Sequence, residues 1–188
     1  MFAISGLAET LWFEAEVGYN NGLDVSDSIA VATKHIDEAL ALTRQYYWMP
    51  LSKSKILMLK VKSGFSKDVA ADMVLAKTLI DESLALNAKY AETHLALSYW
   101  YYIQIQSSEL SHEKKIHYQK ALTSADQALA VNAHTAQAYL LKVALTKLAQ
   151  VKDIPVNHET KTIQSWINKA KELNPHARLW QLPNNSSY

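Results

Sequence analysis

One eight-residue pattern recurs four times along the chain. It occupies residues 36–43, 80–87, 125–132 and 167–174, and the four starts are 44, 45 and 42 residues apart. A near-constant period of this length is typical of stacked supersecondary units, whereas a chain folded around one irregular core has no reason to keep it. The sequence therefore predicts a helical repeat array.

The composition favours helices over strands. The chain has four glycines and four prolines, which are too few for the tight turns of an all-β fold or for a phosphate-binding loop. Cysteine is absent, so disulfides, thiolate metal ligands and cysteine nucleophiles are excluded. The net charge is +1 and the basic residues are interleaved with acids, which gives no basis for nucleic-acid binding. We expect an all-α fold.

Residues that stop helices divide the chain into eight helical segments, which we expect to form four antiparallel pairs. Pro50 suits the first turn of the third helix, and Ser111 and Asn157 are the expected N-caps of the sixth and eighth helices. We expect one repeat domain over residues 1–177 and a mobile C-terminal tail over residues 178–188. The predicted helices span residues 3–19, 27–43, 50–62, 67–86, 89–106, 112–131, 134–150 and 158–173.

The second helix of each pair carries small or apolar residues at the same three positions. Steps of four and three residues place these positions on one helix face, which we expect to line the inside of each helical hairpin. The three columns are Ala32, Ala76, Ala121 and Ile163; Ile36, Ile80, Ala125 and Ile167; and Ala39, Ser83, Ala128 and Ala170.

These columns resemble the second helix of the tetratricopeptide repeat, whose final proline is matched by Pro175 in the last copy. The first helix of the third pair is similar to the family as well, with His94, Leu97, Ser98 and Tyr101 at its Trp, Leu, Gly and Tyr positions. The resemblance implies an α-α superhelix of about four helix pairs. The period exceeds the family's 34 residues by about eight to eleven, all between the first and second helix of a pair. HEAT and armadillo repeats, at about 40 to 47 residues, are the structural alternative.

The resemblance also implies a function. In the tetratricopeptide family the first helices build a concave surface that binds protein segments, so we expect a noncatalytic protein–protein interaction module, a scaffold. The family's carboxylate clamp has no matching Asn or Arg here, which disfavours chaperone tails as partners. The groove positions carried over are Leu51, Lys55, Met58, Glu92, Leu95, Tyr99, Tyr102, Gln137, Leu140, Ala144 and Lys147.

No motif for catalysis, cofactor binding or metal binding is found. His112 and His117 are five residues apart, which does not place them on one helix face, and no HExxH motif, Walker loop or nucleophile elbow is present. The acidic pairs beginning at Asp37 and Asp81 recur with the repeat, which indicates a solvated face. Two alternatives stay open: a C-terminal regulatory region of a larger bacterial signalling protein, such as a kinase or transcriptional regulator, and an enzyme or small-molecule receptor using the loops within the pairs.

The two ends of the array differ. Lys171 and Glu172 replace the Leu and Ala of the earlier copies, which predicts that the array ends at the eighth helix. The first helix is apolar around more than one face, which indicates either a wide core face or an apolar patch that contacts an upstream domain or a second copy. No apolar run spans a membrane and no signal peptide precedes the fold, so we expect a cytoplasmic protein or a fragment of a longer one. The apolar residues at the first helix are Phe2, Ile4, Leu7, Leu11, Trp12, Phe13, Ala15 and Val17.

Overall fold

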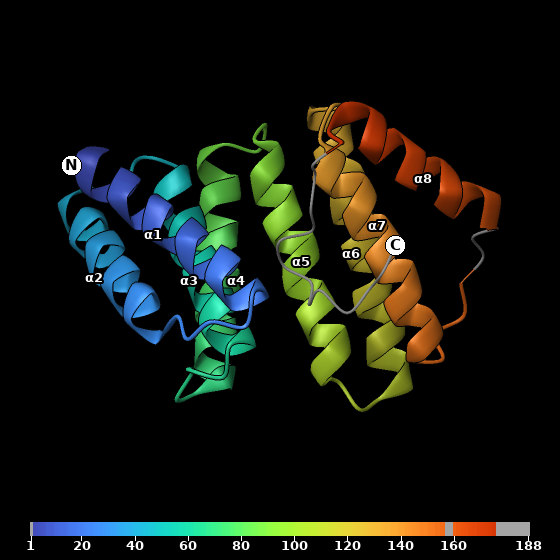
Figure 1. The fold of residues 1–188 in the computed structure, drawn as a ribbon, viewed down its shortest axis with the longest axis horizontal. Coiled ribbons are helices and arrows are strands. Elements are labelled where there is room, and N and C mark those ends of the chain that lie inside the picture. Colours follow the sequence, from blue (N-terminus) through green and yellow to red (C-terminus); the bar gives the residue numbers. More distant parts are fainter. Residues whose placement is uncertain (1, 157–159, 176–188) are drawn as a thin grey trace. The chain divides into compact units, whose positions relative to one another are not determined.

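The computed structural model describes residues 2–156 and 160–175, and within these residues the chain forms eight α-helices and no strand (Figure 1). The all-α prediction is confirmed, and each predicted helix boundary that falls on described residues lies within two residues of the observed one, while the predicted start of the eighth helix at residue 158 lies outside them. The N-cap predicted at Asn157 and the tail of residues 178–188 lie outside the described residues. The helices are α1 (Phe2–Asn20), α2 (Ser26–Leu42), α3 (Trp48–Lys62), α4 (Val69–Leu86), α5 (Ala91–Ser107), α6 (Ser111–Val131), α7 (Ala136–Val151) and α8 (Thr160–Leu173).

The helix starts follow local capping chemistry. Pro50 lies in the first turn of α3, as predicted, where its missing N–H is not needed. Asp68 caps α4, because its carboxylate accepts a hydrogen bond from the backbone N–H of Ala71 at 2.9 Å. The N-cap predicted at Ser111 is wrong, since Ser111 is already the first residue of α6 and the residue at the cap position makes no side-chain cap hydrogen bond.

The turns that follow the first helices are short. Gly22 and Gly64 have φ angles of 77° and 79°, and Asp153 has a φ of 54°, in the left-handed region that ends helices. Only Ser108–Leu110 separate α5 from α6, while α4 and α6 are 18 and 21 residues long. The extra length of the period therefore lies mainly in long helices, and the loop of the third pair is too short to enclose a ligand pocket.

The helices belong to two compact units, α1–α4 and α5–α8. In the first unit α1 contacts α2 and α3, α2 contacts α3, and α3 contacts α4. The second unit has the same pattern, in which α5 contacts α6 and α7, α6 contacts α7, and α7 contacts α8. In both units, within the described residues, the two first helices contact each other and the two second helices do not. The single domain over residues 1–177 stays a prediction.

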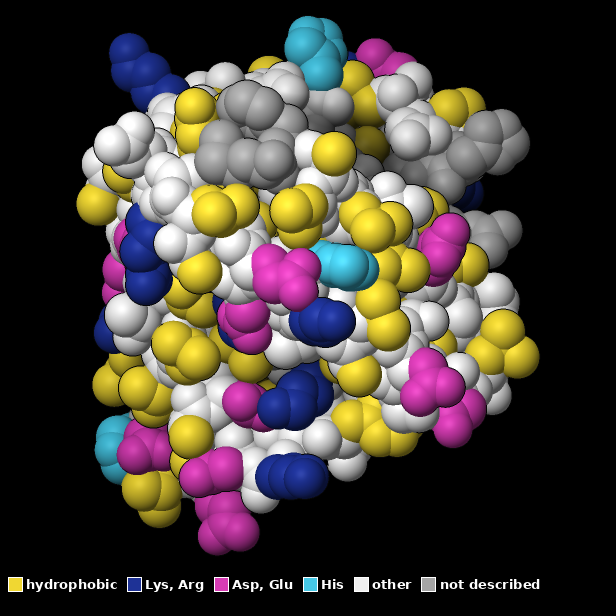
Figure 2. Space-filling view, turned by 90° about the vertical axis from the view of Figure 1, so that its left-hand side faces the viewer, with side chains coloured by type: hydrophobic (Ala, Val, Ile, Leu, Met, Phe, Trp, Pro, Cys, Tyr) yellow, Lys and Arg dark blue, Asp and Glu magenta, His cyan; other side chains and the backbone are white. Residues whose placement is uncertain are grey.

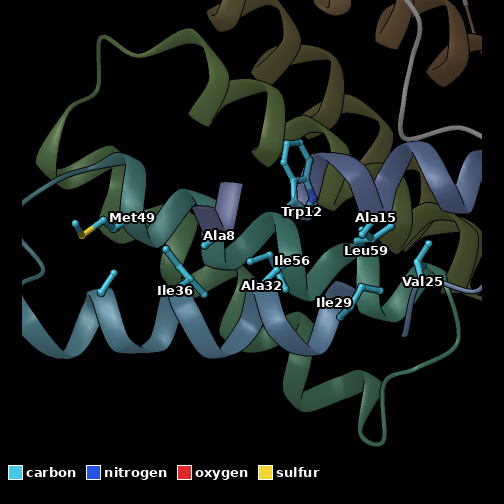
Figure 3. Close-up of a cluster of buried hydrophobic side chains, with 11 residues drawn as sticks. Ala8, Trp12, Ala15, Val25, Ile29, Ala32, Ile36, Met49, Ile56 and Leu59 are labelled. Atoms are coloured by element: carbon cyan, nitrogen blue, oxygen red, sulfur yellow. The ribbon is translucent and has the colours of Figure 1, made fainter. Parts of the chain in front are cut away.

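The core of the first unit is built on the recurring columns (Figure 3). Ala32, Ile36 and Ala39 of α2 are fully buried and pack with side chains of α1 and α3, including Trp12 and Ile56. Alanine in two of the three columns lets neighbouring helices approach closely, and each fully buried isoleucine contributes about 1.5–3 kcal/mol. The prediction that the columns face inward is confirmed, because they are also buried in α4 and α6; in α8, Ala170 is buried and the two isoleucines are half-buried.

Two ion pairs recur where one helix pair meets the next within a unit. Lys53 of α3 contacts Asp37 of α2 at 2.5 Å, and Lys142 of α7 contacts Asp126 of α6 at 2.6 Å. The carboxylates are exposed, as the repeat pattern predicted, but the lysine side chains are only 10% and 13% exposed. The acidic column therefore also joins successive helix pairs.

Candidate functional site

The predicted groove positions of α3, α5 and α7 follow one another at steps of three and four residues within each helix, so each set lies on one face of its helix. In α3 the three positions, Leu51, Lys55 and Met58, are all buried. In the second unit the positions fall into two classes. Leu95, Tyr99, Tyr102 and Ala144 are buried, whereas Glu92, Gln137, Leu140 and Lys147 are half-buried.

The groove positions of α5 and α7 are more accessible than those of α3. The rings of Tyr99 and Tyr102 stack with their centroids 5.8 Å apart, and α5 contacts α7 directly. Gln137 and Leu140 of α7 lie about one helical turn apart, Lys147 follows Leu140 by about two turns, and all three remain partly exposed. The structure thus places buried aromatic rings on α5 and partly exposed polar, apolar and basic side chains on the adjoining α7.

The aromatic run of α5 divides between two faces. Trp100 and Tyr101 are half-buried, in contrast to the buried tyrosines beside them, and their rings meet edge to face at 5.1 Å. The ring of His117 of α6 lies 5.8 Å from Tyr101, and the Lys120 amine lies 5.7 Å from the centre of the Tyr101 ring. Burial, and then the nearby Lys120 charge, lowers the pKa of His117 below its ordinary value. We interpret this cluster as packing between α5 and α6.

A ladder of aromatic and charged side chains joins α1 to α3 in the first unit. The Lys55 amine lies 4.8 Å from the centre of the Trp12 ring, and the Lys62 amine lies 4.8 Å from the centre of the Tyr19 ring. Tyr19 also donates its hydroxyl hydrogen to the Lys62 carbonyl at 3.1 Å, and Lys62 donates to Asn20 Oδ1 at 3.2 Å. These contacts hold two lysines against α1.

Glu16 belongs to the same ladder and is the most unusual charged group of the described chain. It follows Trp12 by four residues and precedes Tyr19 by three, so the three share one face of α1. Its side chain is 2% exposed and its Oε2 has no hydrogen-bond partner among the described residues. Burial raises the pKa of this carboxyl from 4.5 to about 7, although the charges of Lys62 and Lys55 act to lower it.

Burial also lowers the pKa of Lys62 to about 8, against the opposing effect of Glu16. Glu16 is not among the site residues predicted from the sequence, although the sequence carries a signal for it. An acid in the buried column of α1 breaks the apolar pattern that Ala8, Trp12 and Ala15 otherwise maintain.

Neither a metal site nor a membrane span emerges from the described residues. Within residues 2–156 and 160–175, no three or more histidine and acidic side chains gather with the geometry of a metal site. In the same part of the chain, no helix is long and apolar enough to cross a membrane. A scan against protein-family models and a search of curated proteins both found no match to the sequence.

Proposed function

We propose that this protein is a noncatalytic protein–protein interaction module built from tetratricopeptide-like helix pairs, and that the first helices bind a segment of a partner protein. One observation carries the proposal. In each unit the first helices contact each other and the second helices do not, so the first helices share one side of the unit. That is the arrangement from which helical repeat proteins form their binding surfaces.

The side chains of α7 indicate what kind of segment would bind in the second unit. Leu140 offers an apolar contact, Gln137 an amide for backbone hydrogen bonds, and Lys147 a cation at the edge. A segment with an apolar side chain and a carboxylate about 10 Å apart fits this set, because Leu140 and Lys147 are separated by seven residues of α7. Burial of Tyr99 and Tyr102 assigns their rings to supporting the face from below, because rings with little exposed area offer a partner little contact.

The burial of these tyrosines decides which variants test the proposal. Alanine at either position would cost the fold several kcal/mol, on the order of the cost of removing a buried ring, so lost binding there would be uninformative. A better variant combines Leu140→Asp with Lys147→Glu, because both side chains are only half-buried. The matched control combines Gln119→Asp with Lys115→Glu on the exposed surface of α6, which makes the same change in charge.

The assay is quantitative affinity capture from an extract of the source cells, followed by mass spectrometry. We expect the unchanged protein and the α6 control to retain the same partner, and the α7 variant to lose it at unchanged helicity by circular dichroism. Retention of every captured protein by the α7 variant would refute the placement of binding on this face.

A further inference from the structure

Helices α1 and α3 are the first helices of their pairs. Helix α3 is buried all round over residues 49–59. Helix α1 buries one face only, which includes Ser5, Ala8 and Trp12, each at most 5% exposed.

The two helices differ on a second face. In α3, Met49, Ile56 and Leu59 are buried in the cluster that also holds side chains of α1 and α2. In α1, by contrast, Ala3, Thr10 and Phe13 are exposed. Helix α1 therefore keeps a face open to solvent, whereas α3 has none between residues 49 and 59.

This outer face of α1 is apolar, with small residues near its start. Ala3, Gly6, Thr10, Phe13 and Val17 follow one another at steps of three and four residues, which forms one stripe along a helix. Phe13 and Val17 are each 42% exposed, and Leu7 beside them is 45% exposed. Figure 2 shows the end of the molecule that carries α1 and α2, where hydrophobic side chains are exposed between charged ones.

Thr10 and Gly6 lie on this stripe one helical turn apart. The hydroxyl of Thr10 donates to the Gly6 carbonyl at 3.0 Å, so its hydrogen-bonding capacity is turned to its own helix. A Cβ placed on Gly6 would meet no atom within 4 Å. Glycine inside a helix costs about 0.5–1 kcal/mol relative to alanine, and no contact in the described chain compensates for this cost. The close approach of another helix backbone to Gly6 would compensate for this cost.

The charges beside the stripe have one sign. Glu9 and Glu14 lie on its two sides and are exposed. The first 33 residues of the sequence contain five acids and no lysine or arginine. A helix that packs along this stripe would therefore meet carboxylates on both flanks.

We infer that the outer face of α1 binds an amphipathic helix of a partner protein, with small and apolar residues along one stripe and lysine or arginine on both flanks. The surface is distinct from the first-helix face proposed above for binding an extended segment. A second copy of this chain fits less well. Two α1 faces would oppose acids to acids, and the exposed side of α8 is polar, with Gln164, Ser165 and Asn168.

The probe for this inference is a fluorescein-labelled synthetic helix of 18 residues, with Ala and Leu along one stripe and Lys elsewhere; a peptide with Glu in place of Lys is its control. Binding to the full chain is measured by fluorescence anisotropy at low and high salt. The test variants are Glu9→Lys with Glu14→Lys, and separately Gly6→Leu. Two controls are matched in chemistry on other exposed surfaces: Glu38→Lys with Glu109→Lys, and Ala30→Leu.

We expect the Lys peptide to bind and the Glu peptide not to bind, with affinity falling as salt screens the carboxylates. Each test variant should weaken binding by about tenfold or more without lowering thermal stability, and each control variant by less than about twofold. The inference is overturned if the Lys peptide does not bind, or if the controls weaken it as much as the test variants. It is also overturned if sedimentation velocity shows a dimer that Gly6→Leu dissociates, because α1 would then bind a second copy.

Discussion

Replacing Glu16 with glutamine is expected to stabilise the protein above pH 7 and to leave its stability nearly unchanged below pH 4.5. Burial raises the pKa of the Glu16 carboxyl from 4.5 to about 7 in the folded protein. The folded chain therefore keeps this proton over a range of pH in which the unfolded chain has already released it. Between pH 4.5 and 7 the free energy of unfolding falls as pH rises, and above pH 7 the full penalty is present. Glutamine, which has nearly the same shape and no charge, removes that penalty.

The size of the effect follows from the two pKa values. One pKa unit corresponds to about 1.4 kcal/mol, so the shift at Glu16 corresponds to a destabilisation on the order of 3 kcal/mol at pH 8. At pH 5 the same relation leaves less than about 1 kcal/mol. Because the pKa of Lys62 is lowered to about 8, the contribution of Lys62 to the free energy of unfolding becomes more favourable as pH rises beyond 8. The comparison therefore stops at pH 8.

The assay is urea denaturation of both proteins at pH 5, 6, 7 and 8, followed by circular dichroism. The matched control is Glu14→Gln, which removes an exposed carboxylate from the same helix. The ¹³C shift of the Glu16 carboxyl carbon measures its titration directly. A stability difference that does not grow with pH, or one that Glu14→Gln reproduces, would refute the reasoning that this buried carboxyl is ionised at a cost to the fold.

Three further outcomes are expected. Ala121→Leu should lower the free energy of unfolding by about 1–3 kcal/mol in urea denaturation, because the alanine is fully buried in the packed column of α6. Gly22→Ala should destabilise the protein by about 1–2 kcal/mol, because its φ of 77° suits glycine, while Gly6→Ala in open helix should stabilise it; thermal unfolding compares the two. Asp126→Asn should cost no more than about 1 kcal/mol in urea, since the carboxylate that pairs with Lys142 is exposed, and the cost should shrink in high salt.

The helices and their inner faces could be predicted from the sequence because both depend on local chemistry. Periodic alanines and isoleucines such as Ala32 and Ile36 must share a helix face, and a face of small and apolar residues must be buried. Helix ends follow from residues such as Gly22 and Pro50, which act within a few residues of themselves. Ser111 shows the limit of such rules, because it was predicted to cap α6 but is the first residue of the helix, one position later.

Only the tertiary structure decided which residues of the first helices are accessible. Tyr99 of α5 and Leu140 of α7 are both groove positions on first helices, yet Tyr99 is buried and Leu140 is half-buried. Exposure differs because it depends on neighbouring helices that are distant in sequence. The burial of Glu16 and the exposure of Phe13 on the same helix have the same origin. The sequence by itself determined the repeat and the inward faces, since periodicity is a local property. Solvent access and the shifted pKa of a carboxyl were determined by packing between helices, since desolvation arises from all the atoms around a group.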